Sequence, residues 1–425
     1  MRAPLSWIKE FVEIPSSITA DQISDALIRV GFEVEEIITQ GSDLTGPLVF
    51  GKVLSIEEIT EFKKPIRYVG LDCGEAETRY VICGATNFAV GDIVCVALPG
   101  AILPGNFLIA ARETYGKTSN GMICSARELG ISDDHAGIMT FAEGSVEIGA
   151  DAIAALEIND VIFDIAVNPD RGYALSIRGV AREVAASLGL KFTDPVDALR
   201  QLSFTDTGVG VSAKIVDKDA ASVFYLRTLS DFDQSAQTPI WMRRRIEKMG
   251  MRSISLVVDI TNYVMLELGQ PLHAFDADKI DGGLSIKRAG SVQKFTTLDG
   301  QVRTLDSDDL MVWDGAKPLA LAGTMGGLES EITDSTTRIA VEAVRFNPVA
   351  VAKNSRRHKL SSEASRRLER SVDPSLAQFS SARFVQLLTS LSTAKHVATV
   401  VDGEPKYSPV VAVDPAYVSR TLGID

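Results

Sequence analysis

Four polar side chains that can bind or orient a substrate lie close together in one segment of this 425-residue chain. Thr261 and Asn262 are adjacent, and His273 and Asp276 follow within the run DITNYVMLELGQPLHAFD. Polar groups collected where one element passes into the next are a common way to place a site on a rigid frame. The segment therefore indicates a functional site, although spacing alone does not separate it from a histidine that only ties down a loop.

The sequence does not indicate a metal site or a protein nucleophile. No motif with the order and spacing of a Ser, His and acid triad is recognisable, and the histidines do not form a metal-like cluster. The cysteines lack CxxC pairing, so we expect reduced core thiols, and neither zinc nor a disulfide framework. The histidines are His135, His273, His358 and His396, and the cysteines are Cys73, Cys83, Cys95 and Cys124.

Local patterns predict the elements that position the segment. An apolar, β-branched run over 254–260 predicts a buried strand. Thr261 and Asn262 are expected to cap a short helix that ends at Gly269. A Gln-Pro turn then presents His273 beside the end of the strand.

The sequence of the first half of the chain predicts one domain in two parts, with a second domain inserted between them. A capping box over Thr19–Gln22 begins one helix with an apolar stripe, and Gly189 ends a second. Between them, short alternating strands and glycine turns predict a small β-barrel over residues 40–151. Residues 1–39 and 152–200 are then the two parts of an α/β domain.

The second half predicts a mixed α+β domain over residues 201–400, after a linker near residues 194–207. Asp373 and Pro374 have the N-cap and N1 types that begin its last strong helix. Residues 401–425 predict one strand and one helix, too little for a core, so we expect the start of a further domain.

Composition restricts the class of protein and of partner. Hydrophobic residues make up 45% and charged residues 23%, as in ordinary globular domains. A transmembrane helix is excluded because no apolar stretch reaches about 18 residues, and the N-terminus lacks a secretory signal, so we expect a cytoplasmic protein. A net charge of -13 argues against indiscriminate nucleic-acid binding, but a specific RNA partner needs only a local basic surface.

Two basic segments are candidates for such a surface. Residues 353–370 carry seven positive charges and residues 241–252 carry five. In the absence of other support, a solvated face is the favoured explanation of both.

Motifs along the whole chain resemble one family in its order. PLSWIKEFVEI is followed by YGKTSNGMICSARELGI, the histidine segment, LALAGTMGG, IAVEAVRFNP and SRRHKLSSEASRRLERSVDP. Together they resemble the N-terminal half of the bacterial phenylalanyl-tRNA synthetase beta subunit. The resemblance implies that the barrel is an OB-type tRNA-binding module, that residues 201–400 form an editing domain, and that residues 401–425 begin a truncated winged-helix-like domain.

The resemblance also implies partners and cofactors. The intact enzyme is expected to contain two alpha and two beta chains and to bind tRNA(Phe), with neither membrane nor DNA as a partner. ATP and Mg²⁺ serve the intact enzyme, in which the alpha subunit carries the ATP-dependent aminoacylation site. We expect no cofactor in this part of the beta subunit.

Editing of tyrosine has a physical motive. A pocket shaped for phenylalanine rejects tyrosine by only about 100-fold, because tyrosine merely adds a hydroxyl. A second site that requires the hydroxyl can discriminate by about 10⁴-fold or more, since phenylalanine would leave a buried polar group unpaired.

Motif matching assigns the floor and walls of that second site. Glu342 takes the place of the tyrosine-reading carboxylate, and an ionised carboxylate is the strongest acceptor for a phenol. Gly326 and Ala364 match small residues around the aminoacyl group. A strand glutamate paired to an arginine and an ordinary glycine turn are the structural alternatives.

The remaining matches concern the reaction itself. His273 and Arg252 match residues that orient the tRNA end or the reacting water, and Thr261, Asn262 and Ser362 match the pocket rim. Ser362 departs from a threonine common in the family. We expect oriented water to attack the ester, with substrate hydroxyls and backbone N–H groups stabilising the oxyanion. A scaffold that binds tRNA without editing and a free-standing editing protein are the alternatives.

Overall fold

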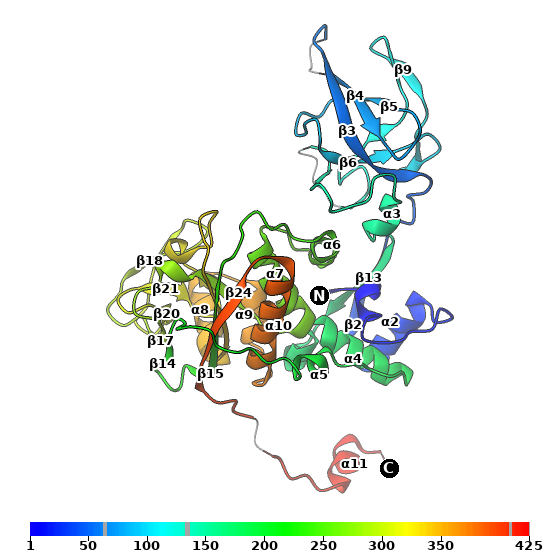
Figure 1. Ribbon diagram of the computed structural model, residues 1–425. Helices are drawn as coiled ribbons and strands as arrows, with labels where there is room; N and C mark the ends of the chain where they lie inside the picture. Colours follow the sequence, from blue (N-terminus) through cyan, green and yellow to red (C-terminus); the bar gives the residue numbers. More distant parts are fainter. Residues whose placement is uncertain (63–65, 132–136, 408–409, 425) are drawn as a thin grey trace.

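The computed structural model describes residues 1–62, 66–131, 137–407 and 410–424, so His135 lies outside the described residues. The chain forms a split N-terminal domain, a β-barrel and a larger α+β domain, which is the predicted fold class (Figure 1).

The N-terminal domain is built from the segments on both sides of the barrel. Its antiparallel sheet has the order β1-β13-β2, so a strand that follows the barrel in sequence lies between two that precede it. The first long helix begins with the predicted capping box. The elements are β1 (Arg2–Pro4), α1 (Leu5–Ile8), α2 (Ala20–Arg29), β2 (Glu33–Gln40), β13 (Asp160–Ala166), the 3₁₀ helix η1 (Pro169–Ala174), α4 (Ile177–Leu188) and α5 (Pro195–Leu199). The last lies within the predicted linker, where Asp194 caps it.

The barrel is the body at the top of Figure 1. Its main sheet has the order β11-β6-β3-β4-β5, with β12 also paired to β6. All four cysteines are buried within this part and unpaired, as expected. The elements are β3 (Leu48–Ile59), β4 (Ile66–Asp72), β5 (Arg79–Cys83), β6 (Ile93–Ala97), β7 (Ile102–Leu103), β8 (Phe107–Leu108), β9 (Arg112–Thr114), β10 (Lys117–Ser119), β11 (Met122–Ile123), β12 (Thr140–Phe141) and α3 (Ala152–Ala155).

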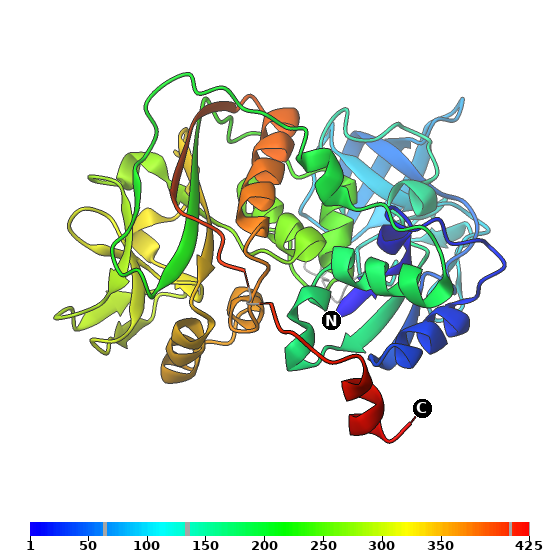
Figure 2. The same ribbon diagram turned by 90° about the horizontal axis from the view of Figure 1, so that it is seen from below.

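The third domain contains a five-stranded sheet, a four-stranded sheet and a pair of long helices. Figures 1 and 2 show them as three layers. The sheets have the orders β14-β17-β20-β21-β22 and β16-β23-β15-β24. The strands are β14 (Ala213–Ile215), β15 (Ala221–Ser230), β16 (His273–Asp276), β17 (Leu284–Arg288), β18 (Lys294–Thr296), β19 (Val302–Thr304), β20 (Leu310–Trp313), β21 (Pro318–Leu321), β22 (Met325–Gly326), β23 (Ile339–Phe346) and β24 (Lys395–Gly403). The helices are α6 (Ile240–Lys248), α7 (Leu256–Leu268), η2 (Ala277–Lys279), η3 (Leu328–Ser330), α8 (Pro348–His358), α9 (Glu363–Leu368) and α10 (Leu376–Leu391).

The predicted strand over 254–260 is wrong. Its apolar residues from Leu256 onward open α7, for which Ser255 is the N-cap and Gly269 the C-cap, whereas Ile254 lies before the helix and is exposed. Because α7 is buried on nearly all sides, it lacks the polar face that marks a surface helix, and a short apolar run does not distinguish helix from strand. Thr261 and Asn262 are therefore inside the helix and not at its cap.

Two other boundaries also differ from the prediction. The last long helix begins at Leu376 with Ser375 as N-cap, and the Asp373 carboxylate instead accepts hydrogen bonds from the Ser375 backbone and side chain. Near the C-terminus, residues 410–413 form no strand, but the predicted helix is present as α11 (Ala416–Leu422).

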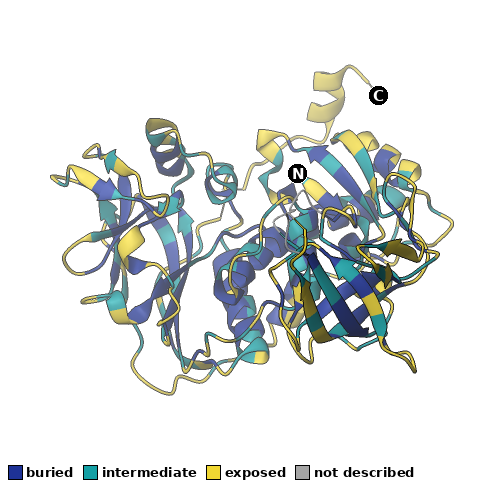
Figure 3. Cartoon of the chain, turned by 90° about the horizontal axis from the view of Figure 1, so that it is seen from above, coloured by how far each residue is buried: buried dark blue, intermediate teal, exposed yellow. Residues whose placement is uncertain are grey.

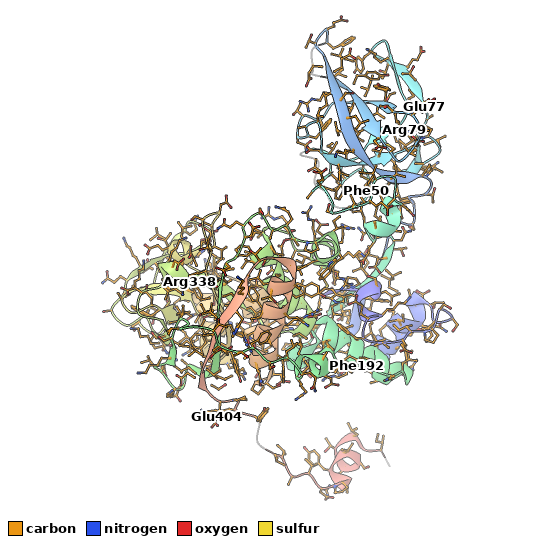
Figure 4. All side chains as sticks on the ribbon, in the orientation of Figure 1. Phe50, Glu77, Arg79, Phe192, Arg338 and Glu404 are labelled. Atoms are coloured by element: carbon orange, nitrogen blue, oxygen red, sulfur yellow. The ribbon has the colours of Figure 1, made fainter. Side chains whose placement is uncertain are left out.

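The chain leaves the third domain after β24, near Glu404, which Figure 4 labels. Residues 410–424, including α11, are exposed throughout, as the yellow ribbon of Figure 3 shows. Among the described residues, no helix combines the length and apolar character needed to cross a membrane.

Candidate functional site

A cavity of about 70 Å³ lies between the two sheets of the third domain, at their open edge. Its walls come from β16 and β23 of one sheet, β21 and β22 of the other, and α9. One water needs about 10–15 Å³ of such space, so several waters or one ring of similar size fit. The cavity brings together His273, Gly326, Glu342 and Ala364.

Strand register places the two ionisable groups of this cavity side by side. His273 of β16 lies directly opposite Glu342 of the antiparallel strand β23. Residues in this relation project from the same face of the sheet, with Cβ atoms about 4.5–5.5 Å apart. The neighbouring Ala343 faces the other way and packs with Ala377 of α10. Both ionisable side chains therefore project between the sheets.

Glu342 is an isolated buried acid. Glu342 is 5% exposed, and among the described residues no cation is paired with its carboxyl. One carboxyl oxygen, Oε2, is buried and has no hydrogen-bond partner in the part of the chain that the structure describes. Burial raises the pKa of the Glu342 carboxyl to about 8, which favours the neutral acid at pH 7. The alternative of a strand glutamate paired to an arginine is not what the described residues show, and the ionised form expected to accept from a phenol is disfavoured by burial.

His273 is neutral in this environment. Burial lowers the pKa of its imidazole to about 4, so at pH 7 the ring has one donor and one acceptor nitrogen. The ring of Phe275 meets it edge-on at a centroid distance of 4.4 Å. A neutral imidazole in a cavity can orient a water molecule or accept its proton.

Gly326 leaves room for this imidazole. A Cβ atom added there would lie 2.5 Å from Cε1 and 2.7 Å from Nε2 of His273. Any other residue would therefore displace the ring. A glycine is thus required at position 326 because the His273 side chain of another strand comes this close to it. Gly326 also lies in the hairpin of β21 and β22.

The short helix α9 supplies the opposite wall. Ala364 in its first turn lines the cavity, and Ser362 is the N-cap residue, with its hydroxyl accepting a hydrogen bond from the Ser365 N–H. The same hydroxyl donates to the carbonyl oxygen of Thr324 at 3.0 Å. Ser362 therefore fixes the β21–β22 turn to α9 from just outside the cavity.

Besides Ser362, three further candidate residues do not line this cavity. Arg252 is exposed between α6 and α7, and neither Thr261 nor Asn262 lines the cavity. The Thr261 hydroxyl donates to the Val258 carbonyl within α7. Asp276, the other polar residue of the segment, is buried and accepts a hydrogen bond from Thr336, so it stabilises the fold.

Sequence reasoning missed the apolar walls. Val344 and Phe346 line the cavity because they share one face of β23 with Glu342, two and four positions farther along the strand. Strand alternation was the signal that could have found them. Leu368 of α9 and Pro271 before β16 had no such signal, since their position depends on packing between distant segments.

Comparison with known proteins assigns the two larger parts of the chain. A family described as "Putative tRNA binding domain" matches residues 48–151, and one described as "B3/4 domain" matches residues 220–393. The phenylalanine–tRNA ligase beta subunits of Thermobifida fusca and Streptomyces avermitilis are 49% and 48% identical to this chain over 100% of its length. The chain belongs to the phenylalanine–tRNA ligase beta subunit family.

The chain spans about half the length of the curated relatives it matches, 51% and 52% for these two. A solved N-terminal fragment of the phenylalanyl-tRNA synthetase beta subunit from Pyrococcus horikoshii shares 14% identity over 63% of this chain and 73% of that fragment, with a TM-score of 0.30. The family resemblance expected from the motifs is confirmed by the curated relatives, and the cavity lies wholly within the B3/4 match.

Proposed function

We propose that the cavity hydrolyses the ester bond of tyrosyl-tRNA(Phe), so that this part of the beta subunit removes tyrosine attached by error. The observation that supports the proposal most strongly is Glu342, a buried acid with an unpartnered oxygen, opposite a neutral imidazole in a cavity of side-chain size. In a protein of this family, the hydroxyl of a tyrosine substrate would donate a hydrogen bond to this carboxyl oxygen.

The phenol would be recognised by Glu342. A phenol that donates to the carboxylate favours its ionised form, so binding tyrosine would lower the raised pKa of this carboxyl. Phenylalanine would fill the same space and leave Oε2 unpaired. A buried polar group without a hydrogen-bond partner makes the binding free energy less favourable, so the site would bind phenylalanine more weakly than tyrosine.

Hydrolysis would use a water molecule held near His273. The water oxygen attacks the ester carbonyl carbon, the bond from that carbon to the ribose oxygen breaks, and the ribose oxygen takes up a proton. Free tyrosine and tRNA leave. The neutral imidazole orients the water or takes its proton, and backbone N–H groups and substrate hydroxyls stabilise the oxyanion.

The wider setting is proposed from the family. The barrel would contribute to binding of tRNA(Phe), and an alpha subunit would carry out ATP- and Mg²⁺-dependent aminoacylation in an assembly of two alpha and two beta chains. A role in translation places the protein in the cytoplasm.

The test is deacylation of tRNA(Phe) carrying labelled tyrosine or labelled phenylalanine. We expect the chain to release tyrosine selectively, Glu342→Ala to abolish the selectivity, and Ala364→Trp to block release by filling the cavity. Val349→Trp is the matched control, because Val349 is 64% exposed on α8. Equal release of both amino acids would contradict the specificity. Binding of tRNA without release of either amino acid would support the alternative function, a scaffold that binds tRNA without editing.

A further inference from the structure

The outer face of the barrel exposes a stacked pair of tyrosines. Side chains of β4 and β5 alternate, so that Val69 and Val81 enter the barrel core while Tyr68 and Tyr80 point outward. The two rings are stacked, with centroids 5.1 Å apart and planes inclined by 20°. Tyr80 is 42% exposed. A Cβ atom at Gly70 would approach the Tyr80 ring to 3.2 Å, so this glycine leaves space for the ring to lie on the sheet.

A lysine and a second aromatic pair continue this surface. Lys117 of β10 holds its ammonium group 4.9 Å from the centre of the Tyr68 ring. Tyr115, two residues earlier, packs edge-on against Phe62 at 4.7 Å. These two rings are 45% and 44% exposed. In the sequence, Phe62 follows β3 and Tyr115 lies between β9 and β10. The end of β3 and strand β9 are at the end of the barrel farthest from the other two domains (Figure 1).

Charges around the tyrosine pair are balanced. Lys117 also pairs with Glu57 at 3.0 Å, and Arg79, which precedes Tyr80 in the sequence and is labelled in Figure 4, pairs with Glu75 at 2.6 Å. A surface that bound nucleic acid mainly through phosphates would leave its cations free for them. This surface instead combines neutral aromatic rings with a cation over one of them, which suits stacking of a base.

We propose that Tyr68, Tyr80 and Lys117 bind an unpaired base of the tRNA by stacking. The inference deepens the proposed function, on which it rests for the identity of the ligand. The second and third strands of an OB-type barrel form the face on which such folds take oligonucleotides, and here β4 and β5 are those strands. The bases of a duplex have no free face, so the ligand must be a single-stranded part of the molecule.

The test measures the dissociation constant of the whole chain for tRNA(Phe), for a single-stranded oligonucleotide and for a blunt RNA duplex. We expect Tyr80→Ala to weaken binding of the first two by about 5- to 150-fold, the range for loss of one stacked base, and Tyr80→Trp to retain it. The duplex should bind weakly to every variant. Tyr173→Ala is the matched control, since Tyr173 is 39% exposed and has Arg182 over its ring at 4.8 Å but lies in the N-terminal domain.

Salt dependence separates stacking from phosphate contact. We expect the affinity of the wild-type chain for the oligonucleotide to fall only shallowly with salt concentration, because few phosphates are neutralised. A steep fall together with unchanged binding by Tyr80→Ala would overturn the proposal. So would a Tyr80→Ala variant that binds tRNA normally and loses a protein partner.

The experiments distinguish failure of the stacking proposal from failure of the editing proposal. If the wild-type chain binds tRNA and removes tyrosine while Tyr80→Ala does both equally well, the stacking surface is refuted and editing stands. If the wild-type chain binds no tRNA, the ligand assumed by both proposals is wrong.

Discussion

Glu342 shows how a residue suited to recognition destabilises the protein that contains it. Its carboxyl is buried without a cation, and burial raises its pKa from 4.5 to about 8. The folded chain therefore holds a proton that the unfolded chain releases. Between these two pKa values, stability falls as pH rises, because the folded state binds more protons.

This linkage predicts a pH-dependent effect of Glu342→Gln. The amide stays neutral, so the variant should match the wild type near pH 4.5 and become more stable above it. The difference should reach its full size near pH 8, on the order of 5 kcal/mol. Thermal unfolding of both proteins at pH 5 and pH 8 measures it. A difference that is the same at both pH values would show that the Glu342 carboxyl has an ordinary pKa.

Gly326 offers a second prediction at the scale of one residue. Gly326→Ala should displace the His273 ring, since the added Cβ would lie 2.5 Å from Cε1. We expect tyrosine release to fall by at least about 10²-fold, as for loss of a positioned acid–base group, with little change in melting temperature because only a side-chain end moves. Gly84→Ala is the control, as nothing lies within 4 Å of a Cβ atom at Gly84. Normal release by Gly326→Ala would exclude a role for the His273 position.

Among the elements, α9 depends most on a single residue. It has only six residues, and Ser362 both caps it and holds the Thr324 carbonyl of the neighbouring turn. A helix this short has little stability of its own, so its position depends on these contacts.

We expect Ser362→Ala to destabilise the domain by about 0.5–2 kcal/mol, the usual range for a lost N-cap, and to reduce tyrosine release because the wall that carries Ala364 loosens. Ser362→Thr keeps the hydroxyl and should retain both properties. Denaturant unfolding and deacylation report the two effects. Equal behaviour of the alanine and threonine variants would show that the hydroxyl is dispensable.

At the scale of the whole molecule, the N-terminal domain and the B3/4 domain share one hydrophobic core. Trp7 and Val180 belong to the same buried cluster as Val344 beside Glu342, whereas the barrel has separate clusters. A buried arginine of α9, Arg367, also donates to the Leu175 carbonyl of the N-terminal domain. The cavity is therefore held by both domains.

This division predicts two unfolding transitions. Val81→Ala in the barrel and Val180→Ala in α4 remove the same atoms from sites that are 0% exposed, and each should destabilise its unit by about 2 kcal/mol. Calorimetry should show that the first substitution moves only the barrel transition, and that the second moves the transition of the two joined domains and lowers the temperature at which editing is lost. A single transition moved equally by both would show one cooperative unit.

The local sequence by itself determined the features that depend on neighbouring residues. The capping box at Thr19, the end of α7 at Gly269 and the alternating barrel strands follow from hydrogen bonds and side-chain directions within a few residues. The motifs also marked Glu342, His273, Gly326 and Ala364, which the structure places around one cavity.

Only the tertiary structure decided what depends on contacts between distant segments. It made residues 256–260 part of a buried helix and left Arg252, Thr261 and Asn262 outside the cavity. It also set His273 opposite Glu342 and buried the Glu342 carboxyl, which raises the pKa of this acid. Burial and strand register arise when remote parts of the chain pack together, so a local sequence pattern does not determine them.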